Sequence, residues 1–397
     1  MSARGHRWAS GPQPRRRPRP LAALTRSLLV ATAFVLGGCG ATEARPDHAV
    51  VPSSTRGEAG VWTATPEPVD VNDLDALARG TGSRADAQLR AGDAAWKAGD
   101  SAAAERAYGE AQRLAPNDPA PIVGIARARQ AAAAVPTGFN SAPENATLRA
   151  VTAELRRAVA MDPSYAPAQL ELGRALLVLG DGEGALSCLS KAVAMADRNA
   201  EAHSALGIAQ LAMGQLRDAV KSLERAAALD PDRAERHENL GTALLLAQRT
   251  DDAIAALRRA SMLAPDDAVV RSNLGAAYLA SGQPTLAAVE LQIAVARAPD
   301  VAAHHANLGQ AKLLTGQLDA AATELGAAVK LDPKLTSAWL NLGNVLAKKD
   351  LYPDARKAYE AARALEPDDP TVRGALDDLD KLEKQQPKSK HGTSGRR

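Results

Sequence analysis

The chain has few aromatic residues, few cysteines and no long apolar run. Aromatics make up only 3% of the 397 residues, and the two cysteines are Cys39 and Cys188. Nucleic-acid binding needs basic stripes and stacking faces, so this composition disfavours it. The sequence also shows no phosphate-binding loop, no nucleophile elbow and no convergent carboxylate pair, which leaves no basis for an enzyme. We therefore expect no catalytic residue, metal, cofactor or small-molecule substrate.

The N-terminal stretch has arginines but no acidic residue. Residues 1–26 hold seven arginines, and an apolar run of about eleven residues, 27–37, follows them. This run is shorter than the roughly 20 residues that span a bilayer, so it indicates a secretory signal. Removal of 1–38 changes the charge, because it leaves 41 of the 48 basic residues against 46 acidic ones, a net of −5.

A strict period of 34 residues runs through most of the remaining chain. Five prolines keep this step, namely Pro231, Pro265, Pro299, Pro333 and Pro367. A fixed period of this length indicates a solenoid of stacked units, which builds an extended surface suited to holding other chains. Six Leu-Gly pairs follow the same step, and they begin at Leu172, Leu206, Leu240, Leu274, Leu308 and Leu342.

Each unit has the pattern of two short helices. In 200–233, Leu206 and Gly207 lie on a first helix that Gly214 interrupts, and a second helix follows with leucines on one face. Pro231 ends it, because proline cannot continue the hydrogen-bond ladder. Two such helices cannot bury their apolar faces alone, so neighbouring units must stack.

At these residues the chain resembles the tetratricopeptide repeat (TPR) family, which has small residues at repeat positions 8, 20 and 27 and proline at 32. The resemblance implies an all-α, right-handed superhelical solenoid of helix-turn-helix units. We count eight repeats over 85–369, which begin at residues 85, 119, 166, 200, 234, 268, 302 and 336. The second is longer than the others, and we place its insertion near 133–145. A capping helix is expected at 370–384 and a disordered basic tail at 385–397.

The sequence before Cys39 resembles a bacterial lipobox. Leu36-Gly37-Gly38 precedes the cysteine, so 1–38 would be a lipoprotein signal peptide and Cys39 the lipidated first residue of the mature chain. The alternative is an ordinary signal with an incidental cysteine. Residues 39–84 have a polar composition without periodicity and are expected to form a disordered tether. Gly40 in place of Asp after the lipid site favours the outer membrane, facing the periplasm of a bacterial envelope.

The resemblance also implies where a partner would bind. In the family the first helix of each pair lines the concave face, with positions 2, 5, 6, 9, 12 and 13 exposed there. An amide can match both the N–H and the C=O groups of an extended peptide, so an asparagine ladder at position 6 is a candidate peptide site, unless it is simply family consensus. The ladder consists of Asn239, Asn273, Asn307 and Asn341. Apolar neighbours in the groove or in the inter-repeat core are Leu211, Leu245, Leu279 and Leu313.

Three functions remain open. The first is a membrane-anchored scaffold that binds protein or peptide partners in its groove and supports assembly of a cell-envelope complex, of the secretin and pilus type or the peptidoglycan-enzyme type. The second is a non-catalytic component of a polysaccharide export or biosynthesis machine, although the groove positions considered offer no aromatic ring for a sugar. The third is a cytoplasmic adaptor with a misannotated start.

Overall fold

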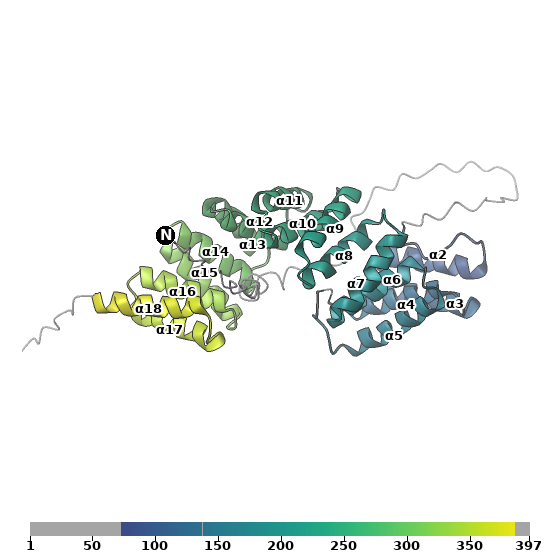
Figure 1. Cartoon of the computed structure of the whole chain (residues 1–397), viewed down its shortest axis with the longest axis horizontal. Helices are drawn as coiled ribbons and strands as arrows, with labels where there is room; N and C mark the ends of the chain where they lie inside the picture. The colour runs from purple at the N-terminus through teal and green to yellow at the C-terminus, as the bar shows by residue number, and fades with distance from the viewer. Residues whose placement is uncertain (1–72, 137, 386–397) are drawn as a thin grey trace, which may run out of the picture.

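The computed structural model describes residues 73–385 except residue 137, and within that range it consists of helices and connections without a strand (Figure 1). The predicted all-α solenoid is confirmed. Sixteen of the helices form eight consecutive pairs, which we number as repeats 1 to 8. The signal peptide, Cys39, most of the expected tether and the basic tail lie outside the described residues.

The helices of each pair have similar lengths in all eight repeats. The first helices are α2 (Arg84–Lys97), α4 (Pro119–Ala132), α6 (Ala166–Leu179), α8 (Ala200–Ala212), α10 (Ala234–Leu246), α12 (Ala268–Ala280), α14 (Ala302–Leu314) and α16 (Thr336–Lys348). The second helices are α3 (Ser101–Leu114), α5 (Ala146–Met161), α7 (Gly182–Met195), α9 (Leu216–Leu229), α11 (Thr250–Leu263), α13 (Pro284–Arg297), α15 (Leu318–Leu331) and α17 (Tyr352–Leu365). One further helix, α18 (Pro370–Gln385), packs against α16 and α17 at the C-terminal end.

In seven of the eight repeats the two helices approach closely because position 8 is a glycine; repeat 2 has Ala126 there. In repeat 4 a Cβ added to Gly207 would lie 2.5 Å from Cγ of Leu223, which is fully buried. The leucine therefore fills the space that glycine leaves, and close packing of this kind does not tolerate an added methyl group without movement. The same pairing recurs in the later repeats, with Tyr359 in place of leucine in repeat 8.

A second recurring contact joins each repeat to the one before it. In repeats 3 to 8 the side chain at position 4 makes a hydrogen bond to the backbone carbonyl six residues earlier, and a proline provides that carbonyl in five of the six cases. Trp339, for example, donates its indole N–H to the carbonyl of Pro333 at 2.9 Å. The bond satisfies a carbonyl left open where the preceding helix ends. The position-4 residues are Gln169, His203, His237, Arg271, His305 and Trp339.

The stacking gives the solenoid an inner and an outer face. Each helix packs against the next in the chain, and consecutive first helices also contact one another, from α2 and α4 through to α14 and α16. The terminal helix α18 contacts α16 in the same way. Consecutive second helices make no contact of that extent within the described residues. The array is elongated and curved (Figure 1). Its first helices therefore line the inner side, and the second helices lie on the outer side.

The insertion in repeat 2 folds onto the array. Residues 133–145 connect α4 to α5. The amides of Asn140 and Ala142 donate to the carbonyls of Leu177 and Val178 at the end of α6, at 3.0 and 3.3 Å. Phe139 is half-buried against the adjoining core. The insertion thus caps the last turn of a first helix.

Candidate functional site

The structure differs from the expected tether over its last residues. Residues 73–80, the docked segment, run along the inner face of repeats 1 to 3 without regular secondary structure, and Asp73 Oδ1 accepts the amides of Asp75 and Ala76 in a local turn. Leu74 and Leu77 are 2% and 1% exposed, and both belong to the core that α2, α4 and α6 share. Burial of the two leucines helps to offset the loss of conformational entropy when the segment becomes ordered. The polar composition of residues 39–84 did not by itself predict this order.

Two carboxylates of α2 bind the main chain of the docked segment. Asp93 Oδ2 accepts the amides of Leu77 and Ala78 at 2.9 and 3.0 Å. Asp86 Oδ1 accepts the amides of Arg79 and Gly80 at 2.6 and 3.1 Å. Four consecutive amides are therefore held by two charged acceptors, and charge-assisted hydrogen bonds of this kind are stronger than neutral ones.

Arg127 of α4 binds the carbonyl side of the same segment. Its Nη2 donates to the carbonyl of Leu74 at 2.7 Å, and its Nη1 donates to that of Asp75 at 3.1 Å. Nε donates to Oε1 of Glu171 on α6 at 2.8 Å, and the arginine is only 3% exposed. The guanidinium therefore joins the docked segment to repeats 2 and 3.

These three side chains also have partners inside the repeats. Tyr108 of α3 donates its hydroxyl to Asp93 Oδ1 at 2.8 Å, and Arg90 donates to Asp86 Oδ2 at 2.7 Å. Burial, together with the charge of Asp93, raises the pKa of Tyr108 above its ordinary value, so the phenol keeps the proton that it donates. Asp86, Asp93 and Arg127 are thus held in place by the repeats themselves.

The side chain of Arg79 fixes the end of the docked segment. Its Nη2 lies 3.0 Å from Oδ1 of Asp118, and its guanidinium carbon lies 4.6 Å from the ring centroid of Tyr165. An ion pair and a cation–π contact together favour a basic residue at this place. The docked segment is therefore recognised by its main chain and by Leu74, Leu77 and Arg79.

The residues that bind this segment are not among those predicted from the sequence. Asp86 occupies position 2, and Asp93 and Arg127 occupy position 9, all of which are inner positions. Two features of the sequence indicate them. They are charged residues at positions expected on the concave face, and the polar stretch before them carries two leucines three residues apart. Only the fold brings that stretch back over α2 and α4.

The four asparagines of the proposed ladder divide into two kinds. Asn239 donates to Ser204 Oγ at 3.4 Å and Asn273 donates to Glu238 Oε1 at 3.1 Å, each across to the preceding repeat, and both are buried. Asn307 and Asn341 are half-buried. The side-chain amides of Asn239 and Asn273 therefore each donate one hydrogen bond to the preceding repeat. Peptide binding by the ladder stays a prediction.

The predicted groove leucines lie at the edge of the core. Leu313 is 7% exposed and belongs to the core between repeats 7 and 8. Leu211, Leu245 and Leu279 are half-buried and pack against core clusters with part of their surface accessible. In the same face Leu314 is 57% exposed. The leucines thus contribute to packing, and three of the four keep some surface open to the inner face.

A buried carboxyl lies on the inner face of repeat 5. Glu238 is 9% exposed and accepts a hydrogen bond from Asn273. Burial raises its pKa to about 8, and the nearby charges of Asp267 and Glu235 act in the same direction. Glu238 therefore takes up a proton near neutral pH.

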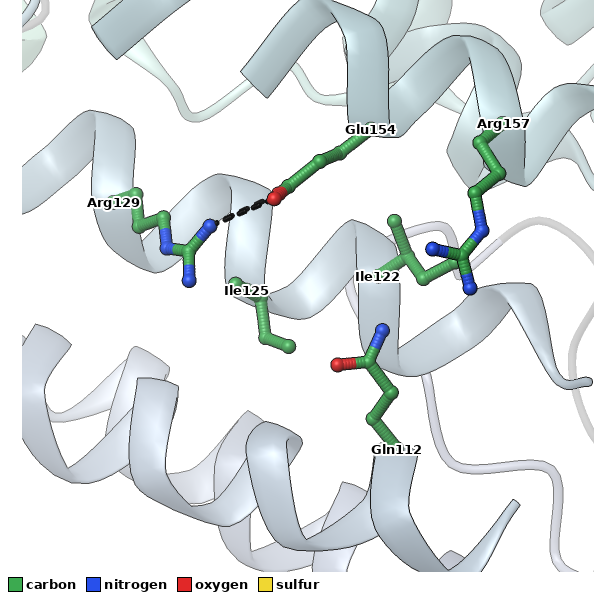
Figure 2. A pocket seen from close by; sticks show the side chains of 6 residues that line it. All are labelled: Gln112, Ile122, Ile125, Arg129, Glu154 and Arg157. Atoms are coloured by element: carbon green, nitrogen blue, oxygen red, sulfur yellow. Dashed lines mark hydrogen bonds and ion pairs between the residues drawn. The ribbon is translucent and has the colours of Figure 1, made fainter. Parts of the chain in front are cut away.

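A small hollow lies between α3, α4 and α5 (Figure 2). Its volume of about 50 Å³ is far below the roughly 300 Å³ of small-molecule sites, so it can hold only a few water molecules. Arg129 spans one side and donates to Glu154 at 2.9 Å. The lining residues are Gln112, Ile122, Ile125, Arg129, Glu154 and Arg157.

Groups that could support other chemistry are few within the described range. No cluster of three histidine, cysteine or acidic side chains there could hold a metal ion. None of the helices described is long and apolar enough to cross a membrane. Cys188 is half-buried, and burial raises the pKa of its thiol. These residues give no support to a metal centre.

Comparison with known proteins gives one consistent family. Models described as tetratricopeptide repeat or TPR repeat match residues 85–118, 147–208, 204–268, 244–313, 309–350 and 336–369, together more than half of the chain. No curated protein sequence matches the chain.

Solved structures with the same fold include a chain of the APC/C hetero-tetramer Cut9–Hcn1. It is 17% identical with a TM-score of 0.57, and the alignment covers 75% of this chain and 56% of that one, so this chain spans just over half of that relative. PilF of Pseudomonas aeruginosa is 20% identical with a TM-score of 0.48, covering 55% of this chain and 98% of its own. YrrB, described as a TPR protein with an unusual peptide-binding site, is 21% identical with a TM-score of 0.40, covering 48% and 97%.

Proposed function

Because this chain belongs to the tetratricopeptide repeat family, we propose that it is a membrane-anchored scaffold whose inner face holds extended segments of partner proteins. One observation carries the proposal. The inner face of repeats 1 to 3 already binds eight residues of non-helical chain, with side chains of α2 and α4 contacting six of its main-chain groups. A surface that binds main chain in this way suits protein ligands, because every protein has the same backbone.

The inner face continues beyond the docked segment. Repeats 5 to 8 present the amides of Asn307 and Asn341 and the exposed side chain of Leu314 on the same side. Their inner positions hold no aromatic residue. Sugar faces stack on aromatic rings, so this composition supports a protein ligand over the polysaccharide alternative.

The anchor is a proposal from the sequence. The basic stretch, the short apolar run and Leu36-Gly37-Gly38-Cys39 support a lipid on Cys39, and Gly40 supports the outer membrane. In this arrangement the chain would help to assemble a cell-envelope complex, of the secretin and pilus type or the peptidoglycan-enzyme type. A cytoplasmic adaptor is the alternative without a lipid.

Crosslinking from the inner face tests the scaffold. A photoreactive amino acid replaces Asn307 or Asn341, with Met262 on the outer side of α11 as the matched control because it is 67% exposed. The proposal expects one recurrent envelope protein, crosslinked through a defined segment, from the inner positions and not from Met262. Equal crosslinking from both faces would contradict it.

Lipid labelling tests the anchor separately. Metabolic incorporation of a labelled fatty acid is expected in the wild type and not in Cys39→Ser, and fractionation should place the wild type with the membrane. A soluble, unlabelled wild-type chain would favour the cytoplasmic adaptor.

A further inference from the structure

We propose that the inner face of repeats 1 to 3 is a peptide site that the docked segment fills in cis, and that a partner segment of the same chemistry binds there by displacing it. That partner is a segment with the pattern Leu-x-x-Leu-x-Arg that adopts the same bent conformation as residues 73–80. The inference rests on the proposed function only in taking the ligand to be a protein segment, because it specifies one site and one pattern.

The site retains its binding groups without the docked segment. Asp93 keeps the hydroxyl of Tyr108, Asp86 keeps Arg90, and Arg127 keeps Glu171. Release of the segment would therefore leave none of these three charges without a protein partner. A site held in its binding geometry by its own repeats spends little free energy on reorganisation when a ligand arrives.

The pattern follows from the side chains that the site buries. The first leucine fits the place of Leu74, and the second, three residues later, fits that of Leu77. An arginine two residues further reaches the position of Arg79, between Asp118 and Tyr165. The residues between them are more accessible and are left unspecified in the pattern, apart from a preference for an acidic residue at the place of Asp75, whose charge acts on Arg127.

A short connection allows the segment to leave without disturbing α2. Residues 81–83 are exposed and join the docked segment to the helix, which Ser83 caps by accepting the amide of Asp86. Gly80 and Gly82 have φ angles of 69° and 68°, a region that glycine adopts at low cost. Rotation about the backbone angles of these two glycines can redirect the chain, so they act as a hinge.

The cis segment competes through its high effective concentration. A short connection holds it near the site at roughly millimolar effective concentration, so a free peptide meets a partly closed site in the wild type. A partner can then reach the site in two ways. Either it also binds elsewhere on the solenoid, or the docked segment is pulled away from the site.

A peptide titration tests this exchange on the full chain. The probe is a fluorescent peptide with the sequence of residues 73–80, Asp-Leu-Asp-Ala-Leu-Ala-Arg-Gly, and its control carries Asp at both leucine places. The variant Leu74→Asp/Leu77→Asp frees the site in cis. We expect the probe to bind this variant at least tenfold more tightly than the wild type, and the control peptide to bind neither.

A third variant locates the binding. Adding Asp93→Ala to the detached variant should weaken the probe at least tenfold, because two amides lose their acceptor, whereas adding Met262→Ala on the outer side of α11 should leave it unchanged. Equal affinity of the probe for wild type and detached variant, both with native helical content, would overturn the proposal. So would an unchanged affinity in the Asp93→Ala variant.

Hydrogen exchange of the wild type supplies a test that needs no variant. If the segment detaches, the amides of residues 77–80 exchange at least tenfold faster than those in the middle of α2 and α4, and excess probe alters their rate. Equal protection would identify the segment as a fixed part of the fold and overturn the proposal, even if the detached variant does not fold. Loss of this site with retained crosslinking from Asn307 and Asn341 would leave the scaffold function standing.

Discussion

The two ends of the inner face have the same backbone and different chemistry. In repeats 1 to 3 the inner positions carry Asp86, Asp93 and Arg127, and these bind the main chain of residues 73–80. In repeats 5 to 8 they carry asparagines, partly buried leucines and the single buried carboxyl of Glu238. Charged side chains therefore mark the occupied end and amides the open end, so a helix pair of fixed geometry takes its binding properties from a few inner positions.

The largest expected effect comes from Arg127→Ala at the occupied end. The change removes the hydrogen-bonded partner of buried Glu171, which keeps only Arg174 at 4.0 Å, and it removes two donors to the docked segment, at a cost of about 3 kcal/mol. Gln310→Ala changes the same repeat position at the open end and should cost less than about 0.5 kcal/mol. Hydrogen exchange of the amides in α4 and α6 measures the loss of stability in Arg127→Ala. Hydrogen exchange of the amides in α14 measures it in Gln310→Ala. If the amides are equally protected from exchange in both variants, position 9 does not differ in importance between the two ends of the inner face.

At the open end, Glu238→Gln should change the dependence of stability on pH. The folded-state pKa is raised to about 8 from an ordinary 4.5, so burying the carboxylate costs free energy that develops as pH rises between these values. Glutamine keeps an acceptor for Asn273 without the charge. The variant should match the wild type near pH 4 and be about 2–4 kcal/mol more stable above pH 8.

Urea unfolding at pH 5 and pH 9, followed by amide exchange in α10 and α12, measures this difference. Glu366→Gln, at an exposed carboxyl, is the control and should show no pH-dependent gain. A Glu238→Gln variant that is less stable than the wild type at pH 9 would show that the carboxylate is compensated in the folded state.

Leu77→Ala tests how firmly the docked segment is held. Loss of a fully buried leucine side chain costs about 2–4 kcal/mol in a rigid core. Here the cost is limited to the free energy that holds the segment, so the expected result is fast exchange at residues 77–80 with little change in α2. Leu314→Ala, at an exposed leucine, should change stability by less than about 0.5 kcal/mol. Global unfolding of repeat 1 in Leu77→Ala would show that the segment is an integral part of the core.

The asparagines should give the smallest changes in stability. Asn273→Ala removes the donor to Glu238 and should cost about 1 kcal/mol, whereas Asn341→Ala should cost less than about 0.5 kcal/mol. Replacing Asn239, Asn273, Asn307 and Asn341 together should reduce partner capture by repeats 5 to 8. Unchanged capture by a folded quadruple variant would show that the ladder is a packing feature of the repeats.

Much of the fold could be predicted because the repeat is local. Gly207 must face Leu223, and Pro231 must end a helix, for reasons that hold within one 34-residue unit. The donors at position 4 could not be predicted in the same way. Glutamine, histidine, arginine and tryptophan share no pattern in sequence, and they share one function only because the turn places a backbone carbonyl, usually that of a proline, beside them.

The sequence by itself determined the helices, their period and the face that each presents, because these depend on contacts within one unit and between neighbours. Only the tertiary structure decided that residues 73–80 return to the inner face, since Asp93, Arg127 and Glu171 come together from three different repeats. Likewise it decided that Asn239 and Asn273 bind the preceding repeat. Such contacts join residues far apart in the chain. They are strong only because the residues are buried, and this burial arises only when several repeats stack.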